Sequence, residues 1–129
     1  MSIYKNIFIL SFIFVLYSAT SLQAACNGGT EIKNTAGTTF CQSNVTMNWW
    51  TASAWCKANG MSLATMYDAC PSWDGNIGSG KCPEMVASGC YYVWTATARL
   101  DTNAYFLYQN AEEVAFTVRQ GDGNKALCK

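Results

Sequence analysis

The chain carries seven cysteines behind a hydrophobic leader and contains no histidine. All seven follow the leader, at Cys26, Cys41, Cys56, Cys70, Cys82, Cys90 and Cys128. Cysteines spread in this way through a short exported chain indicate a disulfide framework. Histidine is the commonest general base and the commonest metal ligand, so its absence disfavours catalysis and metal binding. Because seven is an odd number, at least one cysteine lacks a partner within the chain.

Residues 1–24 are predicted to be a secretory signal peptide. Lys5 gives the start a positive charge, residues 7–17 are apolar, and small and polar residues follow. A membrane-spanning helix needs about 20 apolar residues, so this run is too short to span comfortably. We expect cleavage after Ala24, which leaves residues 25–129 as the mature chain.

Two alternatives stay open for this end of the chain. One is an uncleaved membrane anchor. The other is a lipoprotein signal, because Ala24 and Ala25 are the small residues that such a site needs before its cysteine, Cys26. Gln23, however, stands where an aliphatic residue is expected. No later segment is apolar enough to span a membrane, so we expect a secreted, periplasmic or cell-surface protein.

The composition excludes one class of partner and indicates a single domain. The formal net charge is +0, and the sequence has no basic stripe of the kind that binds nucleic acid. It also has no internal repeat, charge block or low-complexity tract. Residues 25–129 are therefore predicted to form one domain.

Helix signals precede most of the strand signals. Turn residues at 34–37 predict an N-terminal hairpin. Thr46 is the expected cap of a main helix over residues 47–58, and a shorter helix is expected over residues 64–69. Strands are predicted at 91–97, 104–108 and 114–118, forming an antiparallel meander, with a closing strand at 125–128. This order predicts an α+β fold of one main and one short helix with antiparallel strands.

The order of these landmarks resembles the C-type lectin-like domain family, in a compact form similar to domains of bacterial exported proteins. The matching positions are the pair Cys26 and Cys41, the helix pattern Trp49-x-x-Ala52-x-x-x-Cys56, the pattern Gly60-x-x-Leu63-Ala64, the strand residue Trp94 and the terminal Cys128. The resemblance covers residues 26–64 well and residues 91–128 loosely, and the middle is unmatched. It implies a C-type lectin-like domain over residues 25–129.

The resemblance also implies two disulfides. In the family the helix cysteine pairs with the terminal one, which here joins Cys56 to Cys128 and stabilises the fold by about 4 kcal/mol on a chain-entropy model. The family's N-terminal pair corresponds to Cys26–Cys41, which contributes about 3 kcal/mol on the same model. Other pairings of seven cysteines stay open.

Three cysteines remain after these pairs are assigned. Cys70 and Cys82 are each followed by proline and bracket a loop that contains Trp73, so they form the natural third pair. Cys90 is then unpaired. If Cys26 carried a lipid instead, Cys41 and Cys90 would need new partners.

The sequence departs from the family's sugar-binding members at their calcium site. Their Glu-Pro-Asn or Gln-Pro-Asp and Trp-Asn-Asp tripeptides are missing, and the prolines are Pro71 and Pro83 alone. The stretch between Trp94 and Cys128 is also too short for the family's long ligand loop. We therefore expect no Ca²⁺, no zinc, because no Cys-x-x-Cys occurs, and no other cofactor.

The candidate ligand-binding residues are Trp73, Asp74 and Asn76, in the loop between Cys70 and Cys82. An aromatic face beside short polar side chains suits stacking on a sugar ring or anchoring a protein contact. The alternative is that Trp73 folds back to cap the core under this loop.

Three functions follow, in order of preference. The first is a non-catalytic recognition module for carbohydrate binding or adhesion, whose partner is a glycan or a surface protein. The second is a structural or minor subunit of a cell-surface assembly. The third is a small glycosidase that uses two carboxylates among Asp74, Asp101, Glu112 and Glu113.

Overall fold

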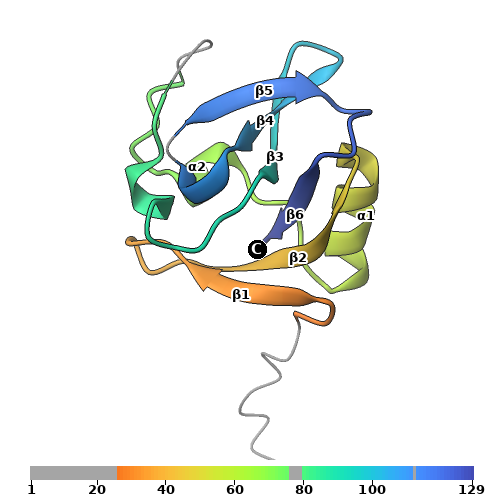
Figure 1. The fold of residues 1–129 in the computed structure, drawn as a ribbon, viewed down its shortest axis with the longest axis horizontal. Coiled ribbons are helices and arrows are strands. Elements are labelled where there is room, and N and C mark those ends of the chain that lie inside the picture. Colours follow the sequence, from red (N-terminus) through yellow and green to blue (C-terminus); the bar gives the residue numbers. More distant parts are fainter. Residues whose placement is uncertain (1–25, 76–79, 112) are drawn as a thin grey trace, which may run out of the picture.

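The computed structural model describes residues 26–75, 80–111 and 113–129. Within them the chain forms a six-stranded sheet in the order β1-β2-β6-β3-β4-β5, together with two α-helices (Figure 1). The α+β class predicted from the sequence is confirmed. The predicted signal peptide, residues 1–24, lies outside the described residues.

The predicted N-terminal hairpin is present. Strand β1 (Gly29–Lys33) pairs antiparallel with β2 (Thr39–Met47). Gly37 turns the chain between them with φ of +89°, a left-handed conformation that glycine adopts without steric cost. The Asn34 side-chain oxygen accepts a hydrogen bond from the Thr38 amide at 2.9 Å, which closes the turn.

The main helix, α1 (Trp49–Ala58), begins later than its predicted start, and its cap is Asn48. The Asn48 side-chain oxygen accepts from the Thr51 amide at 2.8 Å. The predicted cap, Thr46, instead lies in β2 opposite Lys125 of the last strand. The pairing with this distant strand keeps the end of β2 extended, so the helix starts after it.

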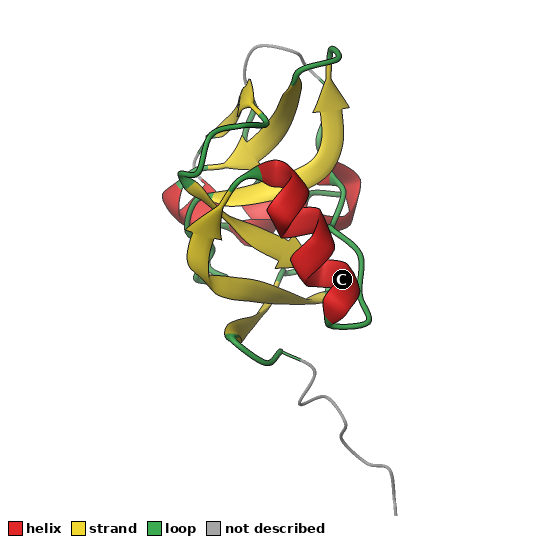
Figure 2. Ribbon diagram, turned by 90° about the vertical axis from the view of Figure 1, so that its right-hand side faces the viewer, coloured by secondary structure: helices red, strands yellow, loops and turns green. Residues whose placement is uncertain are grey.

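Helix α1 packs mainly on β6 and lies beside the sheet (Figures 1 and 2). Ala52 and Cys56 are fully buried on its inner face, as the predicted spacing requires. The shorter helix α2 (Met66–Ala69) starts at Thr65 with a capping box: the Thr65 hydroxyl accepts from the Asp68 amide, and the Asp68 carboxylate accepts from the Thr65 amide.

Strands β3 (Val93–Arg99), β4 (Asn103–Leu107) and β5 (Val114–Val118) form the predicted antiparallel meander. The last strand, β6 (Asn124–Cys128), inserts between β2 and β3. It runs antiparallel to β2 but parallel to β3, so the expectation of antiparallel strands alone is wrong. The reason is that helices and a long loop separate β2 from β3, which frees β3 to enter the sheet in the direction of β6.

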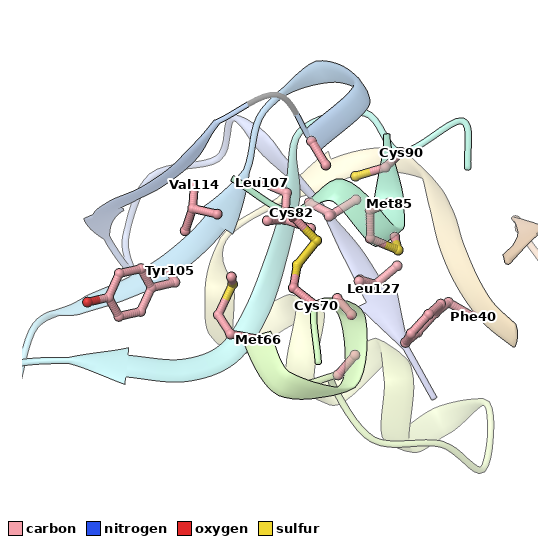
Figure 3. Packing of buried hydrophobic residues seen from close by; sticks show 14 of the residues in the cluster. Phe40, Met66, Cys70, Cys82, Met85, Cys90, Tyr105, Leu107, Val114 and Leu127 are labelled. Atoms are coloured by element: carbon pink, nitrogen blue, oxygen red, sulfur yellow. A yellow bond between two sulfur atoms is a disulfide. The ribbon is translucent and has the colours of Figure 1, made fainter. Parts of the chain in front are cut away.

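Buried side chains form two clusters. The first surrounds the Cys70–Cys82 disulfide, with Met66, Leu107 and Leu127 packed near it (Figure 3). The second lies under α1 around Trp94, whose indole Nε1 donates to the Met47 carbonyl at 2.7 Å. A single turn of 3₁₀ helix lies at Pro83–Met85. A tight turn at Gln109–Ala111, in which Asn110 and Ala111 have left-handed φ of +56° and +53°, joins β4 to β5.

Three disulfides cross-link the described chain. They join Cys26 to Cys41, Cys56 to Cys128 and Cys70 to Cys82, which are the three expected pairs, and Cys90 is a buried free thiol. A disulfide at Cys26 and a lipid on the same sulfur exclude one another. No helix in the described ranges is both long and apolar enough to cross a membrane.

Candidate functional site

Trp73 is buried, with 7% of its surface exposed. Its ring packs against Tyr67 and Tyr105, with centroids 5.2 and 4.9 Å away. The Cys70–Cys82 disulfide is fully buried and draws both ends of the Trp73 loop inward, so the indole comes to rest on the first cluster. Trp73 is therefore not an exposed stacking face. It caps the core, which was the alternative interpretation.

Asp74 and Asn76, the other two predicted ligand-binding residues, do not by themselves make this loop a binding site. Asp74 is exposed and follows Trp73 in the chain. Asn76 lies outside the described residues. With Trp73 buried, the loop does not present the aromatic face on which the sequence-based hypothesis depended.

Two of the four candidate carboxylates, Asp101 and Glu113, line separate hollows. Asp101 lines one with Trp50, whereas Glu113 lines another with Lys81 and Val86. Glu112 lies outside the described residues. A glycosidase needs two carboxyl groups facing each other across one cleft, about 5 to 10 Å apart. Asp101 and Glu113 do not share such a cleft.

In the described part of the chain, one cluster of side chains has atoms of the type and spacing that could bind a metal ion. The sulfurs of Cys70 and Cys82 and a carboxylate oxygen of Glu84 lie within 4.8 Å of one another. The two sulfurs are joined in a disulfide, so neither is the thiolate that a metal requires.

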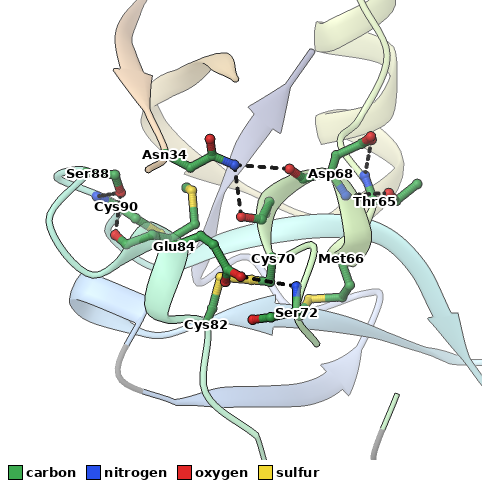
Figure 4. Close-up of a disulfide and its surroundings, with 12 residues drawn as sticks. Asn34, Thr65, Met66, Asp68, Cys70, Ser72, Cys82, Glu84, Ser88 and Cys90 are labelled. Carbon is green, nitrogen blue, oxygen red and sulfur yellow. Dashed lines mark hydrogen bonds between the residues drawn. A yellow bond between two sulfur atoms is a disulfide. The ribbon is translucent and has the colours of Figure 1, made fainter. Parts of the chain in front are cut away.

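Glu84 belongs to the structural framework around that disulfide. Its Oε1 accepts a hydrogen bond from the Ser72 amide at 3.1 Å (Figure 4). Burial raises the pKa of Glu84, but the hydrogen bonds from Ser72 outweigh burial, so the pKa lies below its ordinary value. Nearby, the Asn34 side-chain amide donates to the Asp68 and Ala69 carbonyls and ties the N-terminal hairpin to α2 (Figure 4).

A more promising hollow, of about 410 Å³, lies where α1 begins. Its lining consists of Trp50, Asp101, Thr102, Val118 and Gln120. We call it the Trp50 hollow. These residues come from three separate segments: the first turn of α1, the connection between β3 and β4, and the end of β5.

Backbone hydrogen bonds hold these three segments together. The Trp49 amide donates to the Arg119 carbonyl at 2.9 Å, and the Arg119 amide donates to the Thr102 carbonyl at 3.0 Å. The Arg119 guanidinium also lies over the Trp49 ring, 4.5 Å from its centroid. The walls of the hollow are therefore fixed by the fold rather than by a ligand.

Trp50 gives the hollow an aromatic surface. Its side chain is 50% exposed, and its ring stands edge-on to Trp49 with centroids 6.0 Å apart. Trp49 turns inward, and its Nε1 donates to the Thr95 carbonyl at 2.9 Å. Because neighbouring residues on a helix point about 100° apart, the burial of Trp49 directs Trp50 outward.

The polar side chains of the hollow complement this ring. The Asp101 carboxylate accepts hydrogen bonds, and the Gln120 amide both donates and accepts. The Thr102 hydroxyl donates to the Asn103 side-chain oxygen at 3.1 Å and keeps its acceptor lone pairs. All three are exposed. A pyranose ring presents one apolar face and a rim of hydroxyl groups, so an aromatic surface with short polar neighbours can hold it.

The sequence carries a signal for Trp50. The spacing of Trp49, Ala52 and Cys56 brings these three residues to one face of the helix, which leaves the adjacent Trp50 off that face. The partners Asp101, Thr102 and Gln120 had no such signal, because they reach the hollow only through the pairing of strands far apart in the chain.

Comparisons with models of protein families, with curated proteins and with solved structures found no match. The resemblance to C-type lectin-like domains therefore rests on the residues named above. Function has to be inferred from the chemistry of the site, because a fold alone does not determine it.

Proposed function

We propose that this protein is an exported, non-catalytic recognition module that binds a glycan in the Trp50 hollow without Ca²⁺. The observation that carries the proposal is the half-exposed Trp50 ring beside Asp101, Thr102 and Gln120 in a hollow of about 410 Å³. Ligand sites typically measure about 300–1,000 Å³, so one or two sugar units fit.

The placement of the disulfides supports a compact C-type lectin-like fold. Cys128, on the last strand, bonds to the helix residue Cys56, as the resemblance implies. Trp94 lies on β3, an interior strand of the sheet. Residues 100–102 connect β3 to β4 as a tight turn and leave no long loop there for the family's calcium site.

The cross-links support export. The described chain of this small domain holds three disulfides, which form and persist in oxidising compartments such as the periplasm or the cell exterior. The non-catalytic part of the proposal rests on the missing histidine and on Asp101 and Glu113 lining different hollows.

A structural role in a cell-surface assembly is the second candidate. It is favoured by the exposure of Trp50 and Val118, which are 50% and 51% exposed and line the same hollow. Neighbouring exposed apolar side chains suit packing against another protein.

A glycan array tests the leading proposal. The mature protein is applied with and without EDTA, alongside Trp50→Ala and the control Tyr91→Ala. Tyr91 is a matched exposed aromatic, 45% exposed, and precedes β3, whereas the hollow lies beyond its other end. We expect binding that EDTA leaves intact, that Trp50→Ala weakens about tenfold or more, and that Tyr91→Ala preserves.

Each other outcome removes part of the proposal. Binding that disappears in EDTA contradicts the calcium-free mechanism. Equal losses in Trp50→Ala and Tyr91→Ala move the site away from the hollow. If the protein binds no glycan, the structural role becomes the better explanation. Sedimentation measurements then test that role by showing whether Trp50→Ala disrupts self-association.

A further inference from the structure

The Trp50 hollow is negatively charged. Among the described residues that line it, Asp101 alone carries a charge. Its side chain is exposed and lies in the turn that connects β3 to β4. The described part of the chain contains a single ion pair, which joins Lys129 to Asp68, so Asp101 has no cationic partner among the described residues. Its carboxylate is therefore available to a ligand.

The two arginines of the chain do not neutralise Asp101, although both lie close to the lining residues in the sequence. The Arg99 guanidinium lies over the Phe116 ring, 3.4 Å from its centroid. The Arg119 guanidinium lies over the Trp49 ring at 4.5 Å, and the Nε atom of each arginine is buried. Both positive charges are thus held on aromatic rings of the protein, and neither arginine belongs to the lining of the hollow.

A carboxylate and an aromatic ring in one hollow suit a protonated amine. The carboxylate attracts the positive charge and accepts strong hydrogen bonds from its N–H groups. The face of a tryptophan ring also attracts a cation that comes within about 6 Å of its centroid. Trp50 supplies a half-exposed ring, and the side-chain carbonyl of Gln120 adds a second acceptor.

This combination distinguishes three classes of sugar. A uronic acid carries a negative charge, which Asp101 repels. A neutral sugar can stack on Trp50 but gains nothing from the charge of the hollow. An unacetylated amino sugar has both an apolar ring face for Trp50 and an ammonium group for Asp101. It is therefore the class that uses the whole described lining.

We propose that the Trp50 hollow selects glycans that contain an unacetylated amino sugar, and that Asp101 determines this specificity by binding the ammonium group. This inference rests on the proposed function, since it names the class of glycan for the same site. Trp50 stacks on the sugar ring. Asp101 distinguishes the protonated amine from an acetamido group or a hydroxyl at the same position.

Four soluble probes test the inference by isothermal titration at about pH 6, where an amine with a pKa of about 8 carries a proton. They are a tetramer of glucosamine, a tetramer of N-acetylglucosamine with the same linkage, a galacturonic acid tetramer and tetralysine. The N-acetylated tetramer keeps the sugar backbone and removes the charge. Tetralysine keeps the positive charge and removes the sugar.

The proteins are the wild type, Asp101→Asn and the control Glu31→Gln. Glu31 is exposed on β1, at the opposite edge of the sheet from β5, and it is absent from the lining of the hollow. Each substitution removes one negative charge and nearly preserves the shape of the side chain, so the two variants have the same net charge. Thermal unfolding of each protein is measured in parallel, to show that both variants are folded.

We expect the wild type to bind the glucosamine tetramer about fivefold or more tightly than the N-acetylated tetramer, because an ion pair with hydrogen bonds is added. The galacturonic acid tetramer and tetralysine should bind more weakly than the glucosamine tetramer. Asp101→Asn should reduce the preference for glucosamine to within about twofold, whereas Glu31→Gln should keep it. Raising the salt from about 0.02 to 0.5 M should reduce the preference of the wild type, because salt screens an exposed ion pair.

The preference and the existence of binding fail separately. A preference for glucosamine that survives in Asp101→Asn, or that Glu31→Gln reduces equally, overturns the role of Asp101. Equal or stronger binding of the N-acetylated or the acidic tetramer by the wild type overturns the ligand class and leaves a glycan-binding function standing. Tetralysine that binds as tightly as the glucosamine tetramer overturns selection for a sugar. A wild type that binds no sugar tetramer here and no glycan on the array overturns the proposed function itself.

Discussion

Cys90 shows how burial controls the chemistry of one side chain. It is 1% exposed in the first cluster, and burial raises the pKa of its thiol to about 12. Disulfide exchange proceeds through the thiolate, so this shift suppresses the reactive form near neutral pH. Cys90, the cysteine predicted from the sequence to lack a partner, therefore behaves as an apolar core residue.

Alkylation measures this protection. At about pH 8 in native buffer, iodoacetamide should leave Cys90 unmodified, because the thiol is both enclosed and protonated. After unfolding in guanidinium chloride without reductant, mass spectrometry should find a single adduct, at Cys90. Rapid labelling of the native protein would contradict the burial of Cys90. An adduct on another cysteine would contradict the disulfide pairing.

At the scale of elements, Asp68 links a helix start to the chain's last residue. Its carboxylate accepts from the Thr65 amide in the capping box and forms an ion pair with Lys129 at 3.0 Å. Partial burial raises the pKa of Asp68, but the hydrogen bonds from Thr65 and Lys129 outweigh it and lower the pKa from 3.8. The ionised form is thus favoured in the folded state.

This shift predicts an acid-dependent effect of Asp68→Asn. The unfolded state takes up its proton near pH 3.8 and the folded state only at lower pH, so the contribution of Asp68 is complete above that value and is lost as the pH falls through the lowered pKa. In urea unfolding at pH 7 we expect Asp68→Asn to cost about 0.5–1 kcal/mol, because asparagine keeps an acceptor oxygen but loses the charge at the helix start and the ion pair with Lys129. At about pH 2 the difference from the wild type should shrink. Equal costs at both pH values would show that charge plays no part.

Local patterns predicted most of the elements, and long-range pairing explains the exceptions. The hairpin turn at Asn34 and Gly37 and the strand β5 were found from propensity and turn residues alone. The start of α1 and the parallel pairing of β3 with β6 were missed, because both depend on where β6 inserts. Strand propensity describes a half-buried surface and says nothing about which strand will be the neighbour.

The candidate site was harder to predict than the fold for a related reason. The sequence-based hypothesis chose Trp73 because polar residues and cysteines surround it in the chain, yet the Cys70–Cys82 disulfide buries it. Trp50 has no polar neighbours of that kind in the sequence and acquires Asp101 and Gln120 only in three dimensions.

At the scale of the whole molecule, the Cys56–Cys128 disulfide joins α1 to the final strand across a sequence separation of 72. Both sulfurs lie in the second cluster and are fully buried. A cross-link that closes so long a loop removes much conformational entropy from the unfolded chain. The shorter Cys26–Cys41 loop, with a separation of 15, removes less.

We therefore expect unequal costs from removing these two bonds. The double variant Cys56→Ala/Cys128→Ala should lose about 4 kcal/mol in urea unfolding, and Cys26→Ala/Cys41→Ala about 3 kcal/mol. The difference should widen further because the first pair is fully buried and its removal leaves a cavity. A larger loss from the Cys26–Cys41 pair would reverse the assignment of the main cross-link.

The central position of β6 also makes it the strand that completes the sheet. It fills the gap between β2 and β3, so a chain in which β6 is displaced holds two separate pieces of sheet, β1-β2 and β3-β4-β5, with open edges facing the gap. Cys56 has no partner in such a chain, because Cys128 lies on β6. Open strand edges pair readily with other chains, so displacement of this one strand should make the protein prone to aggregation.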